Sequence, residues 1–396
     1  MADVPAIQPR FQHVTPAFRT FCGEDALAAL PRELDRVGAS RAVIVCALWV
    51  RDHPHVLAAI EKAIGARLAG CFDSVEEHSP VPVVEEARQS LDQARADAVI
   101  AVGGGSAIVT ARAASILLAE RRPVRDLCTR READGQLTSP RLAAPKIPNW
   151  VVPTTPITAY AKAGSAVRDP DTGERLALFD PKTRAQGIFL DPAMALTAPV
   201  GLASSAALNA FAMAVESLQT CPDDPLAEAL LVHALRMLTQ WLPRLHNAPD
   251  QAEPRLRLML AALLCGQGSD YVGGGLAQAL SHAAGPRSSV SNGVVEALLL
   301  PHTMRFNAPV TGPGLTLIAE ALDTRSAAEP AAEKRAIMAV ENFLSGLAVP
   351  ARLRDIGVTR AALAEVADHA MSDWAITRVP RRVERPELDE LLRVAW

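Results

Sequence analysis

The residues of this chain that could do chemistry lie in its second half, in Gly275–His282 and the residues that follow. On a helix, Gln278 and His282 are four positions apart and share one face, so their side chains would point into one site. Asn292 follows ten residues after His282, and Leu300-Pro-His302 comes next. An imidazole can act as a general acid or base near neutral pH, and amides donate and accept hydrogen bonds without charge. These residues could form an active site, and no His-x-x-x-His pair, a common metal-binding arrangement, occurs anywhere in the chain.

A second candidate site is glycine-rich. Gly103-Gly104-Gly105-Ser106 stands between a predicted buried strand at residues 98–102 and a predicted helix at residues 107–118. Glycines let backbone N–H groups approach an oxyanion closely, and a helix N-terminus adds partial positive charge. Ser106 could cap the helix or donate to a phosphate. We therefore predict a phosphate site; the alternative is a glycine-rich β–α turn without a ligand.

Two hydroxyls end another predicted strand, at Pro153-Thr154-Thr155. Ligands of open α/β sheets bind at the carboxyl edge of the strands, which makes Thr154 and Thr155 candidates for the same site. The alternative is a capped strand end.

Strand and helix patterns alternate in the first half of the chain, which indicates a parallel sheet covered on both faces. Residues 121–148 predict a long loop or excursion, and residues 169–173 predict a hairpin turn. Beyond Pro192 the pattern is helix after helix. We place the domain boundary near residue 195, with an α/β domain at 1–195 and an all-helical domain at 196–396. The helices are predicted at 25–37, 55–68, 83–95, 107–118, 204–220, 225–241, 253–268, 272–285, 292–306, 313–322, 330–346, 360–371 and 386–395, and the strands at 41–46, 69–72, 98–102 and 150–152.

The composition excludes several classes of protein. A chain of 396 residues with 49% hydrophobic and 21% charged residues is typical of a soluble protein of at least two domains. The net charge of −4 and the lack of a basic stripe argue against a nucleic-acid binder. No run of 18 apolar residues and no signal-peptide pattern occur, so we expect no membrane partner. The six cysteines include no Cys-x-x-Cys pair, which favours reduced thiols in a cytoplasmic protein.

Taken together, these motifs resemble those of the iron-containing alcohol dehydrogenase family, and within it the maleylacetate reductase branch. The resemblance implies a Rossmann-like dinucleotide-binding domain followed by an all-helical domain, in the fold shared with dehydroquinate synthase. It also implies an active site in the cleft between the domains, an NADH or NADPH cofactor, a small-molecule substrate and a homodimer. It rests on residues 103–106, 153–155, 190–192, 208–216, 278–282, 299–302 and 305–307, with 77–83 and 379–383 resembling the reductase branch.

The resemblance also locates what this chain has lost. The metal ligands of the family, one Asp and three His, fall on Asn209, Met213, Gln278 and Asn292. Neutral amides and a thioether are poor ligands for Fe²⁺ or Zn²⁺, so we predict no metal. The reductase branch is regarded as metal-independent but usually keeps the three histidines, and Glu296 stands where it commonly has another.

His282 occupies the position of a family histidine thought to relay or donate a proton; a helix-face histidine satisfied by a neighbour is the alternative. Tyr160 could donate a proton or bind a substrate carboxylate, although a buried, hydrogen-bonded tyrosine is the more common role. Arg175 replaces a family lysine that reaches the cofactor. Ala47 stands where NAD-preferring members carry an Asp, which leaves NADH and NADPH both open. We expect His302 to be structural, and His78 is a weak candidate.

The sequence therefore predicts a metal-independent NAD(P)H-dependent reductase of a small carboxylated oxo or enone acid, with maleylacetate as the type substrate, in aromatic catabolism. In this hypothesis Arg381, Arg287 or Arg305 holds carboxylates, and the amides of Asn209, Gln278 and Asn292 polarise the carbonyl. Met213 would line the same substrate site. The rival hypothesis is a non-redox hydrolase, lyase or isomerase on the same scaffold, and a third is a non-catalytic oligomerising relative. Nicotinamide binding would separate the first from the second.

Overall fold

The computed structural model describes residues 11–132, 136–220, 223–322 and 331–396. Contacts within the chain divide it into two compact units. The α/β unit contains residues 16–203 and 244–266, and the helical unit contains the described residues of 1–15, 204–243 and 267–396. The boundary near residue 195 divides the sequence rather than the contacts, and it stays a prediction.

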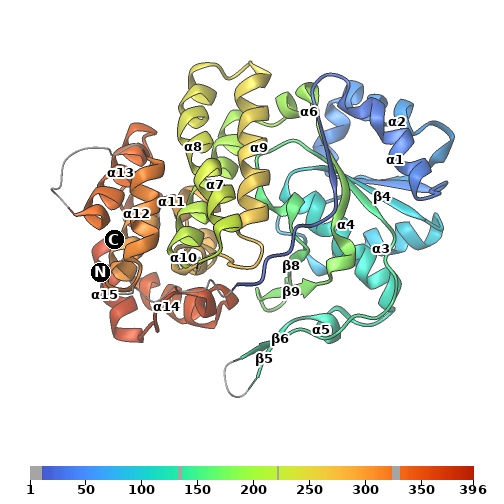
Figure 1. Cartoon of the computed structure of the whole chain (residues 1–396). Helices are drawn as coiled ribbons and strands as arrows, with labels where there is room; N and C mark the ends of the chain where they lie inside the picture. Colours follow the sequence, from blue (N-terminus) through green and yellow to red (C-terminus); the bar gives the residue numbers. More distant parts are fainter. Residues whose placement is uncertain (1–10, 133–135, 221–222, 323–330) are drawn as a thin grey trace, which may run out of the picture. The chain divides into compact units, whose positions relative to one another are not determined.

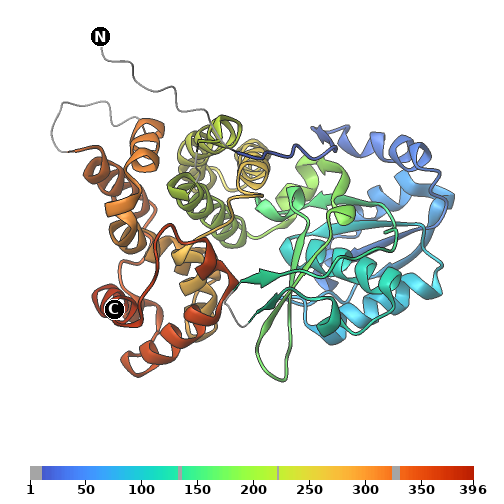
Figure 2. The same cartoon turned by 60° about the horizontal axis from the view of Figure 1, so that its bottom comes forward.

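A six-stranded parallel sheet is the centre of the α/β unit (Figures 1 and 2). All five pairs of neighbouring strands are parallel. The predicted fold class, an α/β domain and an all-helical domain, is confirmed. In sheet order the strands are β1 (Arg19–Cys22), β10 (Ala185–Leu190), β7 (Asn149–Pro153), β4 (Ala98–Gly103), β2 (Ala42–Cys46) and β3 (Leu68–Phe72).

The central strands β2, β4 and β7 are buried along their whole length, as their continuous apolar runs predict. Ile44, Ile100 and Trp150 belong to one core cluster with the first two helices of the unit. Because strand side chains alternate, Val43 and Val99 point to the opposite face, where α3 and α4 lie. The helices are α1 (Leu30–Arg36), α2 (Pro54–Ile64), α3 (Val81–Gln93), α4 (Gly105–Glu120), α6 (Pro192–Thr197) and α9 (Ala252–Gly268), with 3-10 helices η1 (Ala26–Ala29), η2 (Leu48–Asp52), η3 (Gly65–Arg67), η4 (Thr158–Ala161) and η5 (Pro181–Thr183).

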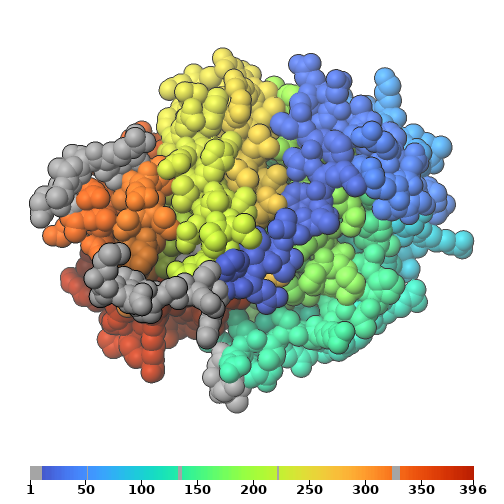
Figure 3. Space-filling view, viewed as in Figure 1, coloured from blue at the N-terminus to red at the C-terminus, as the bar shows by residue number. Residues whose placement is uncertain are grey.

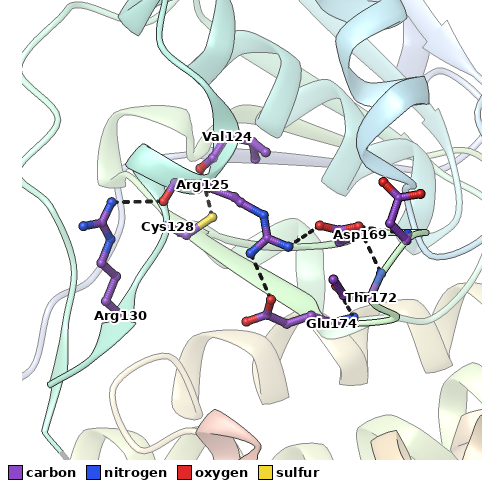
Figure 4. A network of polar contacts seen from close by, with 8 residues as sticks. Val124, Arg125, Cys128, Arg130, Asp169, Thr172 and Glu174 are labelled. Atoms are coloured by element: carbon purple, nitrogen blue, oxygen red, sulfur yellow. Dashed lines mark hydrogen bonds and ion pairs between the residues drawn. The ribbon is translucent and has the colours of Figure 1, made fainter. Parts of the chain in front are cut away.

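The interval 121–148, predicted as a loop or excursion, contains the short helix α5 (Val124–Leu127) and a small antiparallel pair, β5 (Arg130–Arg131) with β6 (Leu137–Thr138). The predicted hairpin turn at 169–173 is confirmed, since it joins β8 (Gly164–Arg168) to β9 (Arg175–Phe179). Arg125 holds the excursion to this hairpin by ion pairs with Asp169 and Glu174 (Figure 4). The excursion forms part of the surface of the α/β unit (Figure 3, teal-green).

The helical unit confirms the order of helices predicted after Pro192. The predicted helix 272–285 begins only at Leu276, because Gly273 has a positive φ of +79° and Gly275 is extended. The helices are α7 (Val200–Thr220), α8 (Pro225–Asn247), α10 (Leu276–Ala284), α11 (Asn292–Asn307), α12 (Gly312–Ala321), α13 (Ala332–Gly346), α14 (Leu363–Ser372) and α15 (Arg385–Ala395), with 3-10 helices η6 (Gly285–Arg287), η7 (Ala308–Val310), η8 (Leu353–Ile356), η9 (Arg360–Ala362) and η10 (Trp374–Arg378).

Helix α7 is long and apolar enough to cross a membrane by length and composition alone. However, 72% of its apolar window is buried inside the structure, as in the core helix of a soluble protein. Most of the candidate residues of the helical unit lie on this helix and on α10 and α11.

Candidate active site

The strand order of the sheet places a ligand crevice at β2 and β4. From β2 the chain passes to β3 on one side and then crosses back to β4 on the other side. Ligands of open α/β sheets bind at such a reversal, outside the carboxyl ends of the two strands. Gly103 ends β4 at this point with a φ of +137°, which side chains other than glycine rarely adopt. The glycine-rich stretch therefore lies where the topology requires a ligand turn.

Helix α4 begins directly after this turn and carries the predicted phosphate site. Gly104 is its N-cap and has no side chain, so the first N–H groups of the helix point outward without a capping oxygen. The prediction that Ser106 caps the helix is wrong, because Ser106 lies inside the first turn and its Oγ accepts a hydrogen bond from the His78 N–H at 3.2 Å. The hydroxyl hydrogen of Ser106 can still donate to a phosphate.

The loop before α3 packs against this helix N-terminus. His78 and Ser79 both have positive φ values, 65° and 50°, which are costly for side-chain-bearing residues. Ser79 is fully buried, and its hydroxyl donates to the Ser106 carbonyl at 3.1 Å. Such strain persists only where surrounding contacts impose it, so this loop is a built part of the site.

Positive charge gathers at the same place. Burial is the main cause that lowers the pKa of His78, and the charges of Arg175 and Arg168 lower it further, against Glu77. Arg168 also donates its backbone N–H to the Ser79 carbonyl at 3.2 Å. The predicted cofactor residue Arg175 therefore lies in the electrostatic surroundings of the α4 N-terminus, as an anion site requires.

Thr154 and Thr155 follow β7, next to β4. The Thr154 N–H donates to the Gly103 carbonyl at 3.0 Å, and a Cβ on Gly104 would lie 3.2 Å from Thr155 Oγ1. Both threonines are buried, and Thr154 Oγ1 has no hydrogen-bond partner within the part of the chain that the structure describes. A buried hydroxyl without a partner is costly, which supports a ligand at this edge of the sheet.

Tyr160 is not placed to act on a substrate, which corrects its candidacy as proton donor. The side chain is completely buried, and its hydroxyl donates to the Met259 carbonyl of α9. Burial raises the pKa of the phenol well above its ordinary value. This is the structural role that the sequence left open.

In the helical unit, α7, α10 and α11 carry the four residues that the resemblance aligns with metal ligands, and these helices lie close together. A Cβ on Gly293 of α11 would lie 2.0 Å from the Ser205 carbonyl of α7, so only glycine permits this approach. One helical turn further along, Asn209 of α7 donates from Nδ2 to Oε2 of the fully buried Glu296 of α11. Met213 is buried one turn beyond Asn209. The structure thus brings Asn209 to Glu296, the residue that the resemblance aligns with a histidine of the reductase branch.

The other two amides lie against glycines at the two ends of α10. A Cβ on Gly274 would lie 2.0 Å from Gln278 Oε1, and one on Gly285 would lie 1.9 Å from Asn292 Oδ1. Gln278 Oε1 is buried and has no hydrogen-bond partner among the described residues. The glycines therefore make room for both amides.

Helix α10 is held at its start by Glu216 of α7. The carboxylate accepts the N–H groups of Gly275, Ala277 and Gln278 at 2.9, 2.6 and 3.2 Å, and so supplies the cap that the N-cap glycine lacks. Burial raises the pKa of Glu216 to about 7, and the three N–H groups lower it in part. The sequence analysis missed this role, although Glu216 ends a stretch that carries the resemblance and precedes a helix without a polar cap.

His282, on the next turn after Gln278, contacts a carboxylate that the sequence analysis missed. Its Nδ1 lies 2.8 Å from Asp373 Oδ2, and the two side chains are only 12% and 9% exposed. The residues are 91 positions apart, so spacing could not reveal the pair. His302, predicted to be structural, is partly buried on α11, and burial lowers its pKa to about 4.

The three arginines predicted to hold substrate carboxylates are engaged within the helical unit, which argues against that role. Arg381 pairs with Glu387 at 2.5 Å and stacks over the ring of Phe306. Arg287 pairs with Glu365 at 2.6 Å, and Arg305 pairs with Glu341 at 2.5 Å. A second carboxylate would have to displace each partner.

Comparisons with known proteins decide the family. The model of the iron-containing alcohol dehydrogenases matches residues 16–192, and the model of the C-terminal part of the same family matches residues 203–396. The chain belongs to the iron-containing alcohol dehydrogenase family. Within the iron-containing alcohol dehydrogenases, it is similar to maleylacetate reductase 1 of Cupriavidus pinatubonensis, with 27% identity over 94% of each chain. It is also similar to lactaldehyde reductase of Escherichia coli, with 28% identity over 94% of this chain and 97% of that enzyme.

Solved structures of iron-containing alcohol dehydrogenases and their relatives share the fold. Maleylacetate reductase from a Rhizobium species matches with a TM-score of 0.78 and 25% identity, over 98% of this chain and 99% of the other. The relatives are oxidoreductases, so this iron-containing alcohol dehydrogenase family member is an oxidoreductase by descent, and the resemblance read from its motifs is confirmed.

Proposed function

We propose that this chain is a metal-independent, NAD(P)H-dependent reductase of a small carboxylated oxo or enone acid, similar to maleylacetate reductase. We further propose that it works in the cytoplasm as a homodimer, on a product of aromatic ring cleavage. Several similar proteins are maleylacetate reductases, which supports the substrate class. The proposal is carried by four neutral residues, Asn209, Met213, Gln278 and Asn292, which the resemblance aligns with the metal ligands of the family.

The residues present do not fit an iron or zinc ion. The Asn209 amide N–H faces Glu296, so the nitrogen is a donor and not a ligand. Met213 offers a soft thioether, which suits neither Fe²⁺ nor Zn²⁺ beside oxygen donors. Within the described residues, no group of three or more His, Cys, Asp or Glu side chains could hold a metal ion. We therefore derive no step through a metal.

The residues of the α/β unit fit a dinucleotide. The N–H groups of Gly104, Gly105 and Ser106 at the start of α4 would hold the pyrophosphate, with Arg175 adding positive charge. The Thr154 and Thr155 hydroxyls would donate to the same ligand, which would give Thr154 Oγ1 a partner that the described residues do not provide. A bound reduced nicotinamide would supply a hydride to the substrate carbonyl.

In the helical unit, His282 would give a proton to the carbonyl oxygen, and Gln278 and Asn292 would donate hydrogen bonds to it in place of a metal. Asn209 already donates to Glu296, so its part is to hold that carboxyl. The proposal assigns no arginine to the substrate, because Arg381 and its two counterparts are paired with acidic side chains.

The test is a titration of chelator-treated protein with NADH and with NADPH by calorimetry, followed by a screen of four- to six-carbon oxo-diacids. We expect micromolar binding of at least one cofactor and turnover that added Fe²⁺ or Zn²⁺ does not raise. No binding of either cofactor would refute the redox reaction and favour the non-redox alternative. Stoichiometric iron or zinc in the purified protein would refute metal independence.

A further inference from the structure

A largely buried contact in the helical unit joins His282 to Asp373. We propose that Asp373 is a positioning residue that fixes the tautomer and orientation of the His282 imidazole, so that Nε2 exchanges the proton with the substrate. The kinetic part of this inference rests on the proposed function, whereas the tautomer of His282 can be measured without it.

The Asp373 carboxylate is itself held in place. Oδ1 accepts the Ala375 N–H at 2.8 Å and thereby caps η10, while Oδ2 faces His282 Nδ1 at 2.8 Å. Rotation of the carboxylate would break both contacts. Its 9% exposure leaves little water to compete for either bond.

The contact sets which ring nitrogen carries a proton. An ionised carboxylate only accepts, so His282 Nδ1 must be the donor. In the neutral ring Nε2 is then the basic nitrogen, and in the protonated ring Nε2–H is the acid. A nearby negative charge also stabilises the protonated ring, which is the form that must donate during reduction.

The proton step balances within this pair. As the hydride that a reduced nicotinamide would supply adds to the carbonyl carbon, the π electron pair of the carbonyl moves to its oxygen. The Nε2 proton passes to that oxygen, the N–H bond breaks and an O–H bond forms. The imidazolium becomes neutral imidazole and keeps its Nδ1 proton against Asp373.

Two other charged groups at the ends of α10 have partners of their own. Arg287, after its C-terminus, pairs with Glu365 and contacts His369 of α14. Glu216 binds the backbone at the opposite end of the helix. The ring of Trp374 lies 6.4 Å from the imidazole, centroid to centroid, and adds an aromatic neighbour without a charge. Of these groups, Asp373 is the one whose charge contacts the His282 ring.

The competing hypothesis is that Asp373 only caps η10 and has no effect on His282. The variant Asp373→Asn separates the capping role from the positioning role. The amide oxygen can keep the Ala375 N–H, and the amide N–H then faces Nδ1. Nδ1 would become an acceptor, and the proton of the neutral ring would move to Nε2. Asp373→Glu keeps the negative charge and should therefore retain part of the wild-type tautomer preference and kcat. Asp368→Asn, on α14 and paired with Arg385, is the matched control.

The first measurement is the ¹⁵N NMR spectrum of the histidines, with His282→Gln to assign the signal. We expect the Nδ1–H tautomer in the wild type and the Nε2–H tautomer in Asp373→Asn. An Nε2–H tautomer in the wild type would overturn the inference, whether or not the protein binds a nicotinamide.

The second measurement is the pH profile of kcat. Asp373→Asn should lower kcat by about 10- to 100-fold, with KM changed less than about threefold, since such supporting carboxylates typically contribute that much. The pH at which the rate falls on the alkaline side should move down, because the amide no longer places a negative charge beside the protonated ring. An unchanged kcat and pH profile in Asp373→Asn, while His282→Gln is inactive, would overturn the positioning role. If the wild-type protein binds neither NADH nor NADPH, the proposed function is refuted instead.

Discussion

Glu216 provides the sharpest test of how burial and charge act on the helix that carries Gln278 and His282. The change is Glu216→Gln, which keeps the shape of the side chain and removes its charge. In the wild type the completely buried carboxyl accepts three backbone N–H groups at the start of α10. Burial raises its pKa from 4.5 to about 7.

The sign of the effect follows from proton binding. Between pH 4.5 and 7 the folded state keeps a proton that the unfolded state has already lost, so the free energy of unfolding falls as the pH rises. At about 1.4 kcal/mol for each unit of pH, this loss is about 3 kcal/mol in total. Glutamine does not titrate. The free energy of unfolding of the variant, relative to that of the wild type, should therefore rise by about 3 kcal/mol between pH 4.5 and pH 8.

His302 changes the free energy of unfolding with pH in the opposite direction, so its contribution must be removed from the comparison. Burial lowers its pKa from 6.5 to about 4, so between these pH values His302 binds a proton in the unfolded state but not in the folded state. Stability from His302 therefore rises with pH over the same interval. Because both proteins contain His302, the difference between variant and wild type removes its contribution.

The assay is urea unfolding followed by circular dichroism at pH 4.5 and pH 8, together with hydrogen exchange of the α10 amides. Glu320→Gln, an exposed glutamate on α12 of the same unit, is the matched control and should show no such change. If Glu216→Gln and the wild type keep the same difference in stability at both pH values, burial does not govern this carboxyl and the reasoning is refuted.

Further predictions concern the two candidate sites. Gly103→Ala should cost about 2 kcal/mol in thermal unfolding and weaken dinucleotide binding in calorimetry, because its φ is +137° and a Cβ would lie 3.2 Å from Ala107; normal affinity would contradict the ligand turn. Tyr160→Phe should keep kcat within about twofold and lose about 1 kcal/mol of stability, since the hydrogen bond from its hydroxyl to the Met259 carbonyl is removed; a large loss of kcat with normal stability would restore its catalytic candidacy. A chelator should leave the melting temperature and kcat of the wild type unchanged. A quadruple variant should bind zinc measurably in calorimetry; it combines Asn209→Asp, Met213→His, Gln278→His and Asn292→His. Failure of this variant to bind zinc would contradict the alignment of these four positions with metal ligands.

The sequence predicted elements where local pattern decides structure and failed where distant contacts decide it. The apolar runs of β2 and β4 and the periodicity of α7 gave the correct elements, because buried strands and core helices depend on hydrophobic pattern. The start of α10 was four residues too early, since the glycines before Leu276 have no pattern of their own.

The spacing of residues in the sequence could not predict which side chains contact each other in the fold. Asp373 lies 91 residues from His282, and Glu296 lies 87 residues from Asn209. The residue types were informative, but which nitrogen faces which carboxylate depends on how α7, α10, α11 and η10 pack. The same limit applies to Tyr160, whose two possible roles differ only in whether α9 covers it.

A chain without a metal, as proposed above, must hold α7, α10 and α11 together by other contacts. Ser291 donates its hydroxyl to Ser205 Oγ at 2.6 Å, and Gly293 lets α11 approach the backbone of α7. Asn209 and Glu296 link the same two helices one turn further on, and Glu216 links α7 to α10. Each of these bonds is buried or partly buried, where hydrogen bonds compete least with water. Four ligands to one ion would tie these three helices together at a single point; here the ties are spread along them. These contacts hold α10, and with it His282, in position, as the proposed metal-independent proton transfer from this histidine requires.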